Sequence, residues 1–316
     1  MKNRLVSNVK SAVTKLGCGI MAGLLLPGNV HGCACGCGVF DVGTSAMFPS
    51  GAGGMAYLQY AYQDQNRNWS GTSQAPAANN DDKEIATHFL TLGLQYLANR
   101  SWGVEAEIPY DFRYFKTMDS GSVVSRSWSQ LGDLRIKGIY TGFFDDMSAG
   151  LTFGLKLPTG SFGYDADLVD RDSQIGTGST DLLLGGFYRG NVPRVHDLEW
   201  FAQLQMDIPT LIQDGYRPGF ELDTALGLDY TGFSLGRVQI VPVAQIIFSE
   251  RTSDSGPNSA SPVASGYQRL MLSPGIEVHL HPIKFYADAE FPVYQNFTGY
   301  QLAAPVLFKL GLSFMF

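Results

Sequence analysis

Apolar and polar residues alternate along most of the chain with a period of two, which is the pattern of a strand that has one apolar and one polar face. In segment 101–115, Trp102 and Ile108 share one face, whereas Glu107 and Arg113 share the other. The same division recurs along the rest of the chain. The predicted strands are 54–64, 85–97, 101–115, 131–143, 147–157, 178–190, 198–209, 219–231, 234–248, 266–281, 283–295 and 303–316.

The number, length and connections of these segments predict a membrane barrel rather than a soluble sandwich. Each segment is long enough to cross a bilayer at a tilt, which takes about 9–11 residues, and the even number suits a bacterial outer-membrane barrel. Long polar links alternate with short ones, as expected for loops outside and turns in the periplasm. We therefore predict an all-β, antiparallel, up-and-down transmembrane barrel of about twelve strands with both termini in the periplasm.

Aromatic residues support this prediction. Tyr96, Trp102 and Trp200 lie near segment ends on the apolar face, as the interfacial girdles of membrane barrels require. The chain ends in LFKLGLSFMF, whose alternate positions are apolar up to the terminal Phe316. A last strand that ends in an aromatic residue is similar to the outer-membrane assembly signal, so we expect Phe316 to be read by the barrel-assembly machinery of a Gram-negative cell.

The first residues have the pattern of a targeting segment. Residues 1–32 carry four bases and no acid, followed by a short apolar run and small residues at Val30 and Gly32. This pattern predicts a secretory signal peptide that is cleaved after Gly32. The predicted organisation is a signal peptide at 1–32, a Cys/Gly-rich leader at 33–53 that is periplasmic or lumenal, and an outer-membrane barrel at 54–316.

Three cysteines, Cys33, Cys35 and Cys37, stand at the start of the predicted mature chain. An odd number of thiols cannot all pair with one another in an oxidising compartment. Cys33 could be a lipidated first residue, since the residues before it resemble a lipobox apart from His31. Alternatively, the three thiolates could hold a soft metal such as Cu(I) or Zn, or they could have no function. All three alternatives stay open.

Composition narrows the class of partner. Only 16% of the residues are charged, 37 are glycines and the net charge is −7. An acidic chain has no electrostatic basis for binding nucleic acid. The expected partners are outer-membrane lipid, lipopolysaccharide and small solutes.

Four charged residues recur at similar places in the strands that run outward. Glu107, Lys156, Asp207 and Glu290 each stand two residues before a proline, on the face predicted to line the lumen. Charges of this kind at one level could form a selectivity ring. The alternative is that they are only solvated side chains in a wet lumen.

Two further groups of residues are weaker candidates for a metal site. His279 and His281 share a face with Glu277, although solvated histidines near a periplasmic turn would give the same pattern. Oxygen ligands dense enough for Ca²⁺ beside lipopolysaccharide occur in one loop, at Asp165, Asp167, Asp170 and Asp172. That loop lacks the glycine and terminal glutamate of an EF-hand, and an acidic solvated loop is the alternative.

Three stretches carry a family resemblance: LGDLRIKGIY at 131–140, TFGLKLPTGS at 152–161 and IGTGSTDLLLGGFY at 175–188. They resemble the outer-membrane family that is named for the meta-pathway of phenol degradation. The resemblance implies an outer-membrane channel or an uptake role.

Together these observations predict a channel through which small solutes diffuse along a polar lumen of mixed charge. The alternatives are a metal- or redox-linked protein that uses the cysteine cluster, and a lipid-anchored structural barrel. No Ser/His or Asp/His constellation of a barrel hydrolase is recognisable, so we predict no enzyme activity and no certain cofactor.

Overall fold

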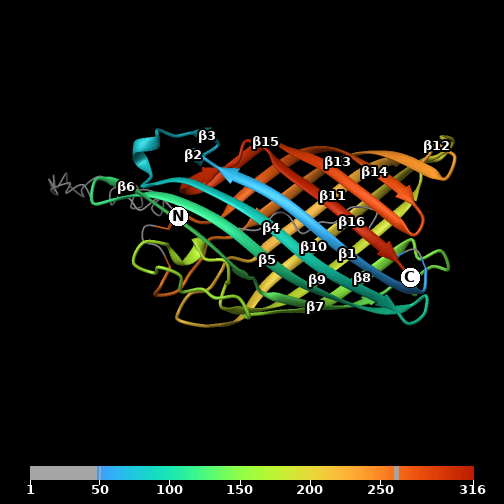
Figure 1. Ribbon diagram of the computed structural model, residues 1–316, viewed down its shortest axis with the longest axis horizontal. Coiled ribbons are helices and arrows are strands. Elements are labelled where there is room, and N and C mark those ends of the chain that lie inside the picture. The colour runs from blue at the N-terminus through green and yellow to red at the C-terminus, as the bar shows by residue number, and fades with distance from the viewer. Residues whose placement is uncertain (1–47, 50, 260–262) are drawn as a thin grey trace, which may run out of the picture.

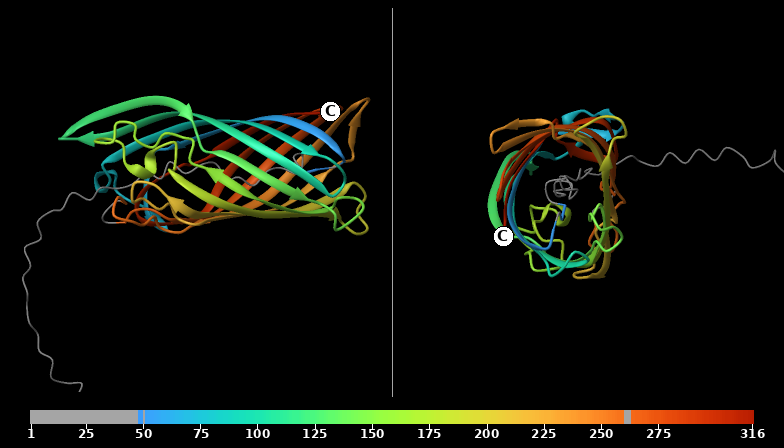
Figure 2. Two further views of the ribbon diagram at one scale, coloured as in Figure 1. Left: turned by 90° about the horizontal axis from the view of Figure 1, so that it is seen from below. Right: turned by 90° about the vertical axis from the view of Figure 1, so that its right-hand side faces the viewer.

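The computed structural model describes residues 48–49, 51–259 and 263–316. The predicted signal peptide and Cys33, Cys35 and Cys37 lie outside the described residues. Twelve antiparallel strands form a closed barrel, which Figure 1 shows from the side and Figure 2 also shows end-on. The barrel strands are β1 (Gly53–Gln65), β4 (Asp82–Leu97), β5 (Trp102–Asp119), β7 (Leu134–Tyr140), β8 (Ala149–Leu157), β9 (Ser179–Asn191), β10 (Leu198–Ile212), β11 (Glu221–Tyr230), β13 (Val238–Arg251), β14 (Tyr267–Leu280), β15 (Ile283–Ala303) and β16 (Leu307–Met315).

Each of these strands pairs with its neighbours in chain order, and β16 pairs with β1 to close the ring. The predicted all-β, up-and-down, twelve-stranded barrel is therefore confirmed. The first residue of β1 and the last residue of β16 both lie at the end of the barrel that carries the short turns. This is the right-hand end in Figure 1. The long connections lie at the opposite end, and we call these the periplasmic and extracellular ends.

Four further strands in the described part lie outside the twelve strands of the barrel wall. β2 (Arg67–Gly71) pairs with β15 and with β3 (Ser73–Gln74), and β12 (Phe233–Leu235) forms a hairpin with β13 at the periplasmic end. β6 (Ser122–Leu131) pairs with the outer half of β5, whereas β7 pairs with its inner half. The two short 3-10 helices in the described part, η2 (Ala77–Asn79) and η3 (Arg171–Ser173), are not of the length and apolarity that cross a membrane.

The two faces of the barrel wall differ as the alternation predicts. On β4 the side chain of Leu94 is 52% exposed, whereas that of its neighbour Gln95 is 5% exposed. On β5 Val104 is 59% exposed and Glu105 is 8% exposed. Apolar side chains therefore cover the outside and polar ones fill the inside, which is the reverse of a soluble protein and is suited to lipid.

Aromatic side chains gather on the outside near the periplasmic turns. The rings of Trp102 and Tyr140 lie 4.7 Å apart, and those of Tyr188 and Trp200 lie 5.2 Å apart. Amphipathic rings at this height match a membrane-water interface.

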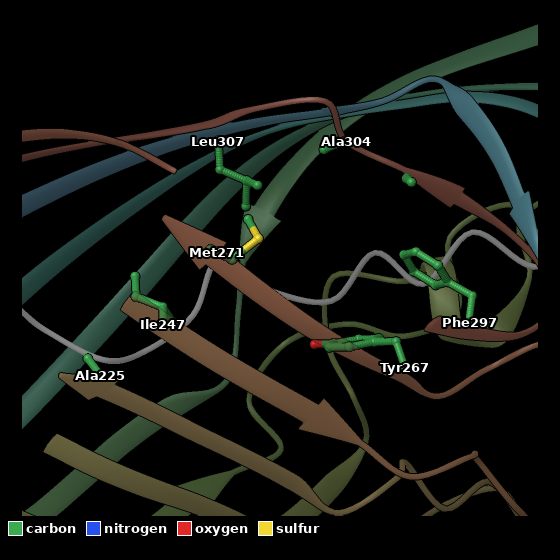
Figure 3. Close-up of a cluster of buried hydrophobic side chains, with 8 residues drawn as sticks. Ala225, Ile247, Tyr267, Met271, Phe297, Ala304 and Leu307 are labelled. Carbon is green, nitrogen blue, oxygen red and sulfur yellow. The ribbon is translucent and has the colours of Figure 1, made fainter. Parts of the chain in front are cut away.

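The inside of the barrel also carries an apolar sector. Ala225, Ile247, Met271 and Leu307 are buried together on the lumen-facing sides of β11, β13, β14 and β16. Figure 3 shows the Met271 and Leu307 side chains next to one another, with Tyr267 and Phe297 further along the same cluster. The lumen wall thus has both charged and apolar regions.

Phe316, the last residue, forms backbone hydrogen bonds with the first strand. The Phe316 N–H donates to the Gly54 carbonyl at 2.8 Å, and the Gly54 N–H donates to the Phe316 carbonyl at 2.7 Å. A Cβ added at Gly54 would lie 2.3 Å from the Phe316 ring, so a glycine is needed for the ring to lie there. These contacts do not test the prediction that Phe316 is an assembly signal.

Candidate functional site

Charged side chains form a row across four neighbouring strands. Glu107, Arg135, Lys156 and Asp181 stand directly opposite one another in the register of β5, β7, β8 and β9. Directly opposed residues point to the same face of a sheet, so all four side chains enter the lumen at one level. Lys156 also pairs with Asp207 of β10 at 3.0 Å and contacts Asp181.

A second network lies on the periplasmic side of this row. The Lys137 ammonium pairs with Glu105 at 3.1 Å and with Glu107 at 2.9 Å. The Tyr57 hydroxyl donates to both carboxylates at 2.8 Å. All four side chains are buried, and the hydrogen bonds lower the cost of burying the charges.

Glu290 belongs to a separate cluster. It pairs with Lys309 of β16 at 3.3 Å, and both side chains are buried. Beside them, the Asp288 carboxylate accepts from Ser273 and from Tyr286, each at 2.7 Å. The polar groups of β14, β15 and β16 thus contact one another within this cluster.

A cavity of about 170 Å³ lies in the extracellular half of the lumen, and we call it the chamber. Its wall includes Glu107, Lys156 and Asp207, three of the four residues of the predicted ring. Glu290 does not line the chamber. The structure therefore brings three of the predicted charges together and leaves the fourth in the cluster around Lys309.

The long loop between β8 and β9, residues 158–178, folds inward and roofs the chamber. Asp133, which directly precedes β7, accepts hydrogen bonds from the Gly160 N–H at 2.9 Å and from the Thr177 N–H at 2.9 Å. The Thr177 hydroxyl donates to the same carboxylate at 2.6 Å. We call these contacts the Asp133 clasp. The clasp joins residues from all three stretches that carry the family resemblance.

Two glycines allow the two ends of the loop to meet at the clasp. A Cβ on Gly160 would lie 2.8 Å from the Gly176 Cα, and one on Gly176 would lie 2.3 Å from the Gly160 carbonyl oxygen. Neither position can accept a side chain without moving backbone. The glycines therefore bring the loop ends close enough for one carboxylate to hold both.

The middle of the loop is held by an arginine of the barrel wall. Arg113 of β5 donates to the Ser173 carbonyl at 2.6 Å and to the Gln174 carbonyl at 3.1 Å. Its Nε donates to the Thr87 hydroxyl at 3.0 Å. Backbone carbonyls of the loop thus occupy this guanidinium, and the loop is fixed to the wall.

β6 supports the same loop from its outer side. Arg126 pairs with Asp165 at 2.5 Å, and the Trp128 ring stacks on the Tyr164 ring at 4.5 Å. The Gln130 amide donates to the Ser161 carbonyl at 2.6 Å. The sequence pattern predicts a connection at 116–130, between two strands. In the structure, β6 forms a hairpin with β5 there and holds the 158–178 loop in place.

A second loop, between β10 and β11, completes the roof. The Tyr216 hydroxyl donates to Asp254 at 2.7 Å, and Arg251 pairs with the same carboxylate at 2.6 Å. Burial raises the pKa of the Tyr216 hydroxyl well above its ordinary value. The Arg171 guanidinium of the first loop lies 4.7 Å from the centre of the Tyr216 ring, so the two loops contact each other.

Asp172 is the titratable carboxyl of the roof that lines the chamber. Burial raises its pKa to about 7, the neighbouring Asp254 carboxylate adds to the shift, and Arg251 opposes it. The other aspartates of this acidic loop do not join it, since Asp165 pairs with Arg126 while Asp167 and Asp170 border an outer surface cavity.

The histidine candidates lie at the periplasmic end. His279 Nε2 is 2.7 Å from a Glu277 carboxylate oxygen, and His281 stands in the turn between β14 and β15. In the described part of the chain, no three His, Cys, Asp or Glu side chains group as they would around a metal ion.

The periplasmic half of the lumen is narrowed by a residue that precedes the first strand. The Phe48 ring stacks on Phe187 at 4.6 Å and meets Phe201 edge-on at 5.9 Å. Arg189 donates to the Pro49 carbonyl at 3.1 Å. A cavity of about 70 Å³ lies against Phe48, and Gln59 and Glu107 line both this cavity and the chamber.

Sequence reasoning missed several residues of this site. Arg135 and Asp181 were not placed in the ring, although both fall on the lumen face of predicted strands. The Asp133 clasp and the inward path of the loop had no signal beyond the three resembling stretches. The position of Phe48 could have been suspected only from its apolar character.

No family model matches this chain, and no curated protein matches it either. Among solved structures, it is similar to an outer membrane channel from Pseudomonas putida F1, with a TM-score of 0.63 and 11% identity over 87% of this chain and 100% of that one. The chain has the fold of an outer-membrane β-barrel. The closed twelve-stranded barrel, with its apolar outer surface and this similarity, places the protein in the outer membrane of the cell.

Two further structures have lower scores and carry no weight for function. The β domain of the Bordetella autotransporter BrkA has a TM-score of 0.49 and 13% identity, with 84% of this chain and 100% of that one covered. The monoaromatic hydrocarbon channel CymD has a TM-score of 0.41 and 9% identity, with 84% and 89% covered.

Proposed function

We propose that this protein is an outer-membrane channel through which small solutes enter the periplasm by diffusion. The observation that carries the proposal is the pair of adjoining cavities inside the barrel, one beneath the extracellular loops and one against Phe48. Because Gln59 and Glu107 line both, the cavities follow one another along the lumen. The similarity to an outer membrane channel supports the same class of function.

The charges of the chamber would filter solutes by sign and size. Glu107, Lys156 and Asp207 line the chamber with both signs of charge. A solute that passes the row must give up part of its hydration water and contact these side chains instead. Glu290 and Lys309 do not line the chamber, so they would act on a solute only through the electrostatic field of their ion pair. The filter is therefore a patch of mixed charge on β5 to β10.

Two constrictions set the access to this path. The roof formed by residues 158–178 and 213–220 limits entry from outside, and the Phe48 ring limits exit to the periplasm. We propose that a signal peptide at 1–32 is cleaved and that residues 33–53, which include Phe48, form a periplasmic or lumenal leader of the mature protein. Passage of a solute would require the Phe48 ring to move.

The family and the partners belong to the same proposal. The convergence of the three resembling stretches on the Asp133 clasp supports membership of the family named for the meta-pathway of phenol degradation. Phe316 would be read by the barrel-assembly machinery, and lipopolysaccharide would surround the extracellular rim. We propose no catalytic role for any residue.

Single-channel recording in a planar bilayer, under a salt gradient, tests the proposal. The purified full barrel should give steady openings, and its reversal potential reports the preference for cations or anions. Folding is checked beforehand by the gel-mobility shift that a folded barrel shows on heating. Silence from a folded barrel, both before and after Phe48→Ala, would overturn the channel proposal.

A further inference from the structure

We propose that the chamber is a binding site for a small organic cation, recognised through the N–H donors of an ammonium group. This inference rests on the proposed function, because it names the class of solute that the channel would select. Three observations carry it: buried carboxylate oxygens without a hydrogen-bond partner among the described residues, an excess of acids over bases in the chamber wall, and apolar side chains in the same wall.

Asp111 of β5 is the first of the open acceptors. It lines the chamber and is 7% exposed, yet its Oδ1 has no hydrogen-bond partner in the described part of the chain. An unsatisfied buried carboxylate oxygen is costly, and such groups in native proteins call for an explanation. A donor supplied by a solute would remove this cost.

Two more carboxylates of the chamber have the same property. Oε2 of Glu107 and Oδ1 of Asp172 are buried and, among the described residues, have no hydrogen-bond partner. Both side chains line the chamber, one from the barrel wall and one from the roof. An ammonium group that donates to any one of these oxygens would satisfy a buried acceptor.

Three of the bases in the chamber wall are engaged by groups of the protein. Arg113 donates to two loop carbonyls and to Thr87, and Lys156 pairs with Asp207. Arg251 pairs with Asp254 of the roof. An anion entering the chamber would have to displace these contacts. Seven acids and five bases line the chamber, so its net formal charge favours a cation.

Apolar residues in the same wall favour an organic cation over a metal ion. Phe89, Pro109 and Ile175 line the chamber together with the acids. A short alkyl group gains free energy from burial against such side chains, whereas a hydrated inorganic cation does not. At about 170 Å³, the chamber suits a solute of a few heavy atoms rather than a large ligand.

The experiment is a calorimetric titration of the folded full barrel in detergent. Ethylammonium chloride is the probe, sodium propionate is the anion of similar size, and potassium chloride is the inorganic cation. We expect ethylammonium to bind, propionate not to bind, and potassium not to compete. Asp111→Asn should weaken the binding of ethylammonium at least tenfold. Glu199→Gln, which removes a lumen-side acid outside the chamber, should leave the binding unchanged.

Binding of propionate as tight as that of ethylammonium would overturn the proposal, and so would equal competition by potassium. A folded Asp111→Asn barrel that binds ethylammonium within twofold of the original protein would also overturn it. If Asp111→Asn does not fold, Asp172→Asn in the roof, outside the barrel wall, carries the same expectation of weaker binding.

Conductance of the same preparation separates this inference from the proposed function. A barrel that conducts but does not bind ethylammonium remains a channel, and the cation site is wrong. A barrel that binds ethylammonium but never conducts keeps the site, and the channel proposal is wrong.

Discussion

The carboxylate of Asp133 binds Thr177, 44 residues further along the chain, through both its backbone N–H at 2.9 Å and its hydroxyl at 2.6 Å. Because Asp133 also binds Gly160, one side chain holds both ends of the loop that covers the chamber. A long extracellular loop would otherwise be free to extend into solvent. The clasp therefore helps to keep the lumen roofed, together with the contacts of Arg113 and β6.

Asp133→Ala should release the 158–178 loop. The change leaves two N–H groups and a hydroxyl without their acceptor, at about 1–3 kcal/mol for each buried group. Hydrogen exchange of residues 158–178 should become faster, and single-channel conductance should rise. Asp145→Ala, an exposed acid in the periplasmic turn between β7 and β8, should change neither. Unchanged exchange in a folded Asp133→Ala barrel would contradict the role of the clasp.

Phe48→Ala should widen the periplasmic end of the lumen. Loss of the stack on Phe187 and the edge contact with Phe201 removes about 0.5–1.5 kcal/mol for each aromatic pair, beyond the loss of buried area. Conductance should increase while the barrel stays folded. Phe144→Ala, on the outer surface beside Tyr188, serves as the control that alters an aromatic contact without touching the lumen. Equal conductance of the two variants would show that Phe48 does not limit passage.

Leu272→Arg should strongly impair the stability of the barrel in lipid. Leu272 is 45% exposed on the outer face, and an arginine near the middle of the bilayer costs about 2–4 kcal/mol. Gln205→Arg on the lumen face should be tolerated better, because Gln205 stands opposite Asp223 in the register. Urea unfolding in lipid vesicles measures both, and equal losses would contradict the assignment of faces.

Phe316→Ala should lower the amount of barrel inserted in the outer membrane. The substitution removes the ring but keeps the backbone hydrogen bonds with Gly54, so it isolates reading of the side chain by the assembly machinery. Membrane levels are measured by immunoblot of outer-membrane fractions, with Phe314→Ala on the same face as the control. Unchanged levels for Phe316→Ala would argue against an assembly signal.

Docking of the roof should weaken as pH rises through about 7. The pKa of Asp172 is raised in the docked loop to about 7 from an ordinary value near 3.8, so the docked state holds the proton more tightly. The resulting stabilisation is full below a pH of 3.8, falls as the pH rises from there, and is lost once the pH passes about 7, when the Asp172 carboxylate faces Asp254. Hydrogen exchange of residues 158–178, corrected for its intrinsic pH dependence, should be slower at pH 6 than at pH 8. Asp172→Asn should remove this difference, and its persistence would assign the effect to another group.

The alternation of the sequence was sufficient to predict the twelve barrel strands and the face that each residue takes. A strand in a barrel wall is apolar toward lipid and polar toward the lumen. The alternation within each segment therefore predicts which side chains face lipid, as Leu94 and Gln95 illustrate. β6 escaped this reasoning because it extends beyond the barrel wall. Its residues, SVVSRSWSQL, meet water rather than lipid and need no apolar face.

Contacts between residues far apart in the chain were decided only by the tertiary structure. The sequence placed Glu107, Lys156, Asp207 and Glu290 on the lumen face, but the strand register determined that Arg135 and Asp181 complete a row with the first two, while Glu290 pairs with Lys309. The period of a strand fixes which face a side chain takes and says nothing of its height relative to a neighbouring strand. That height follows from backbone pairing around the closed ring, and the path of a loop follows from partners such as Asp133.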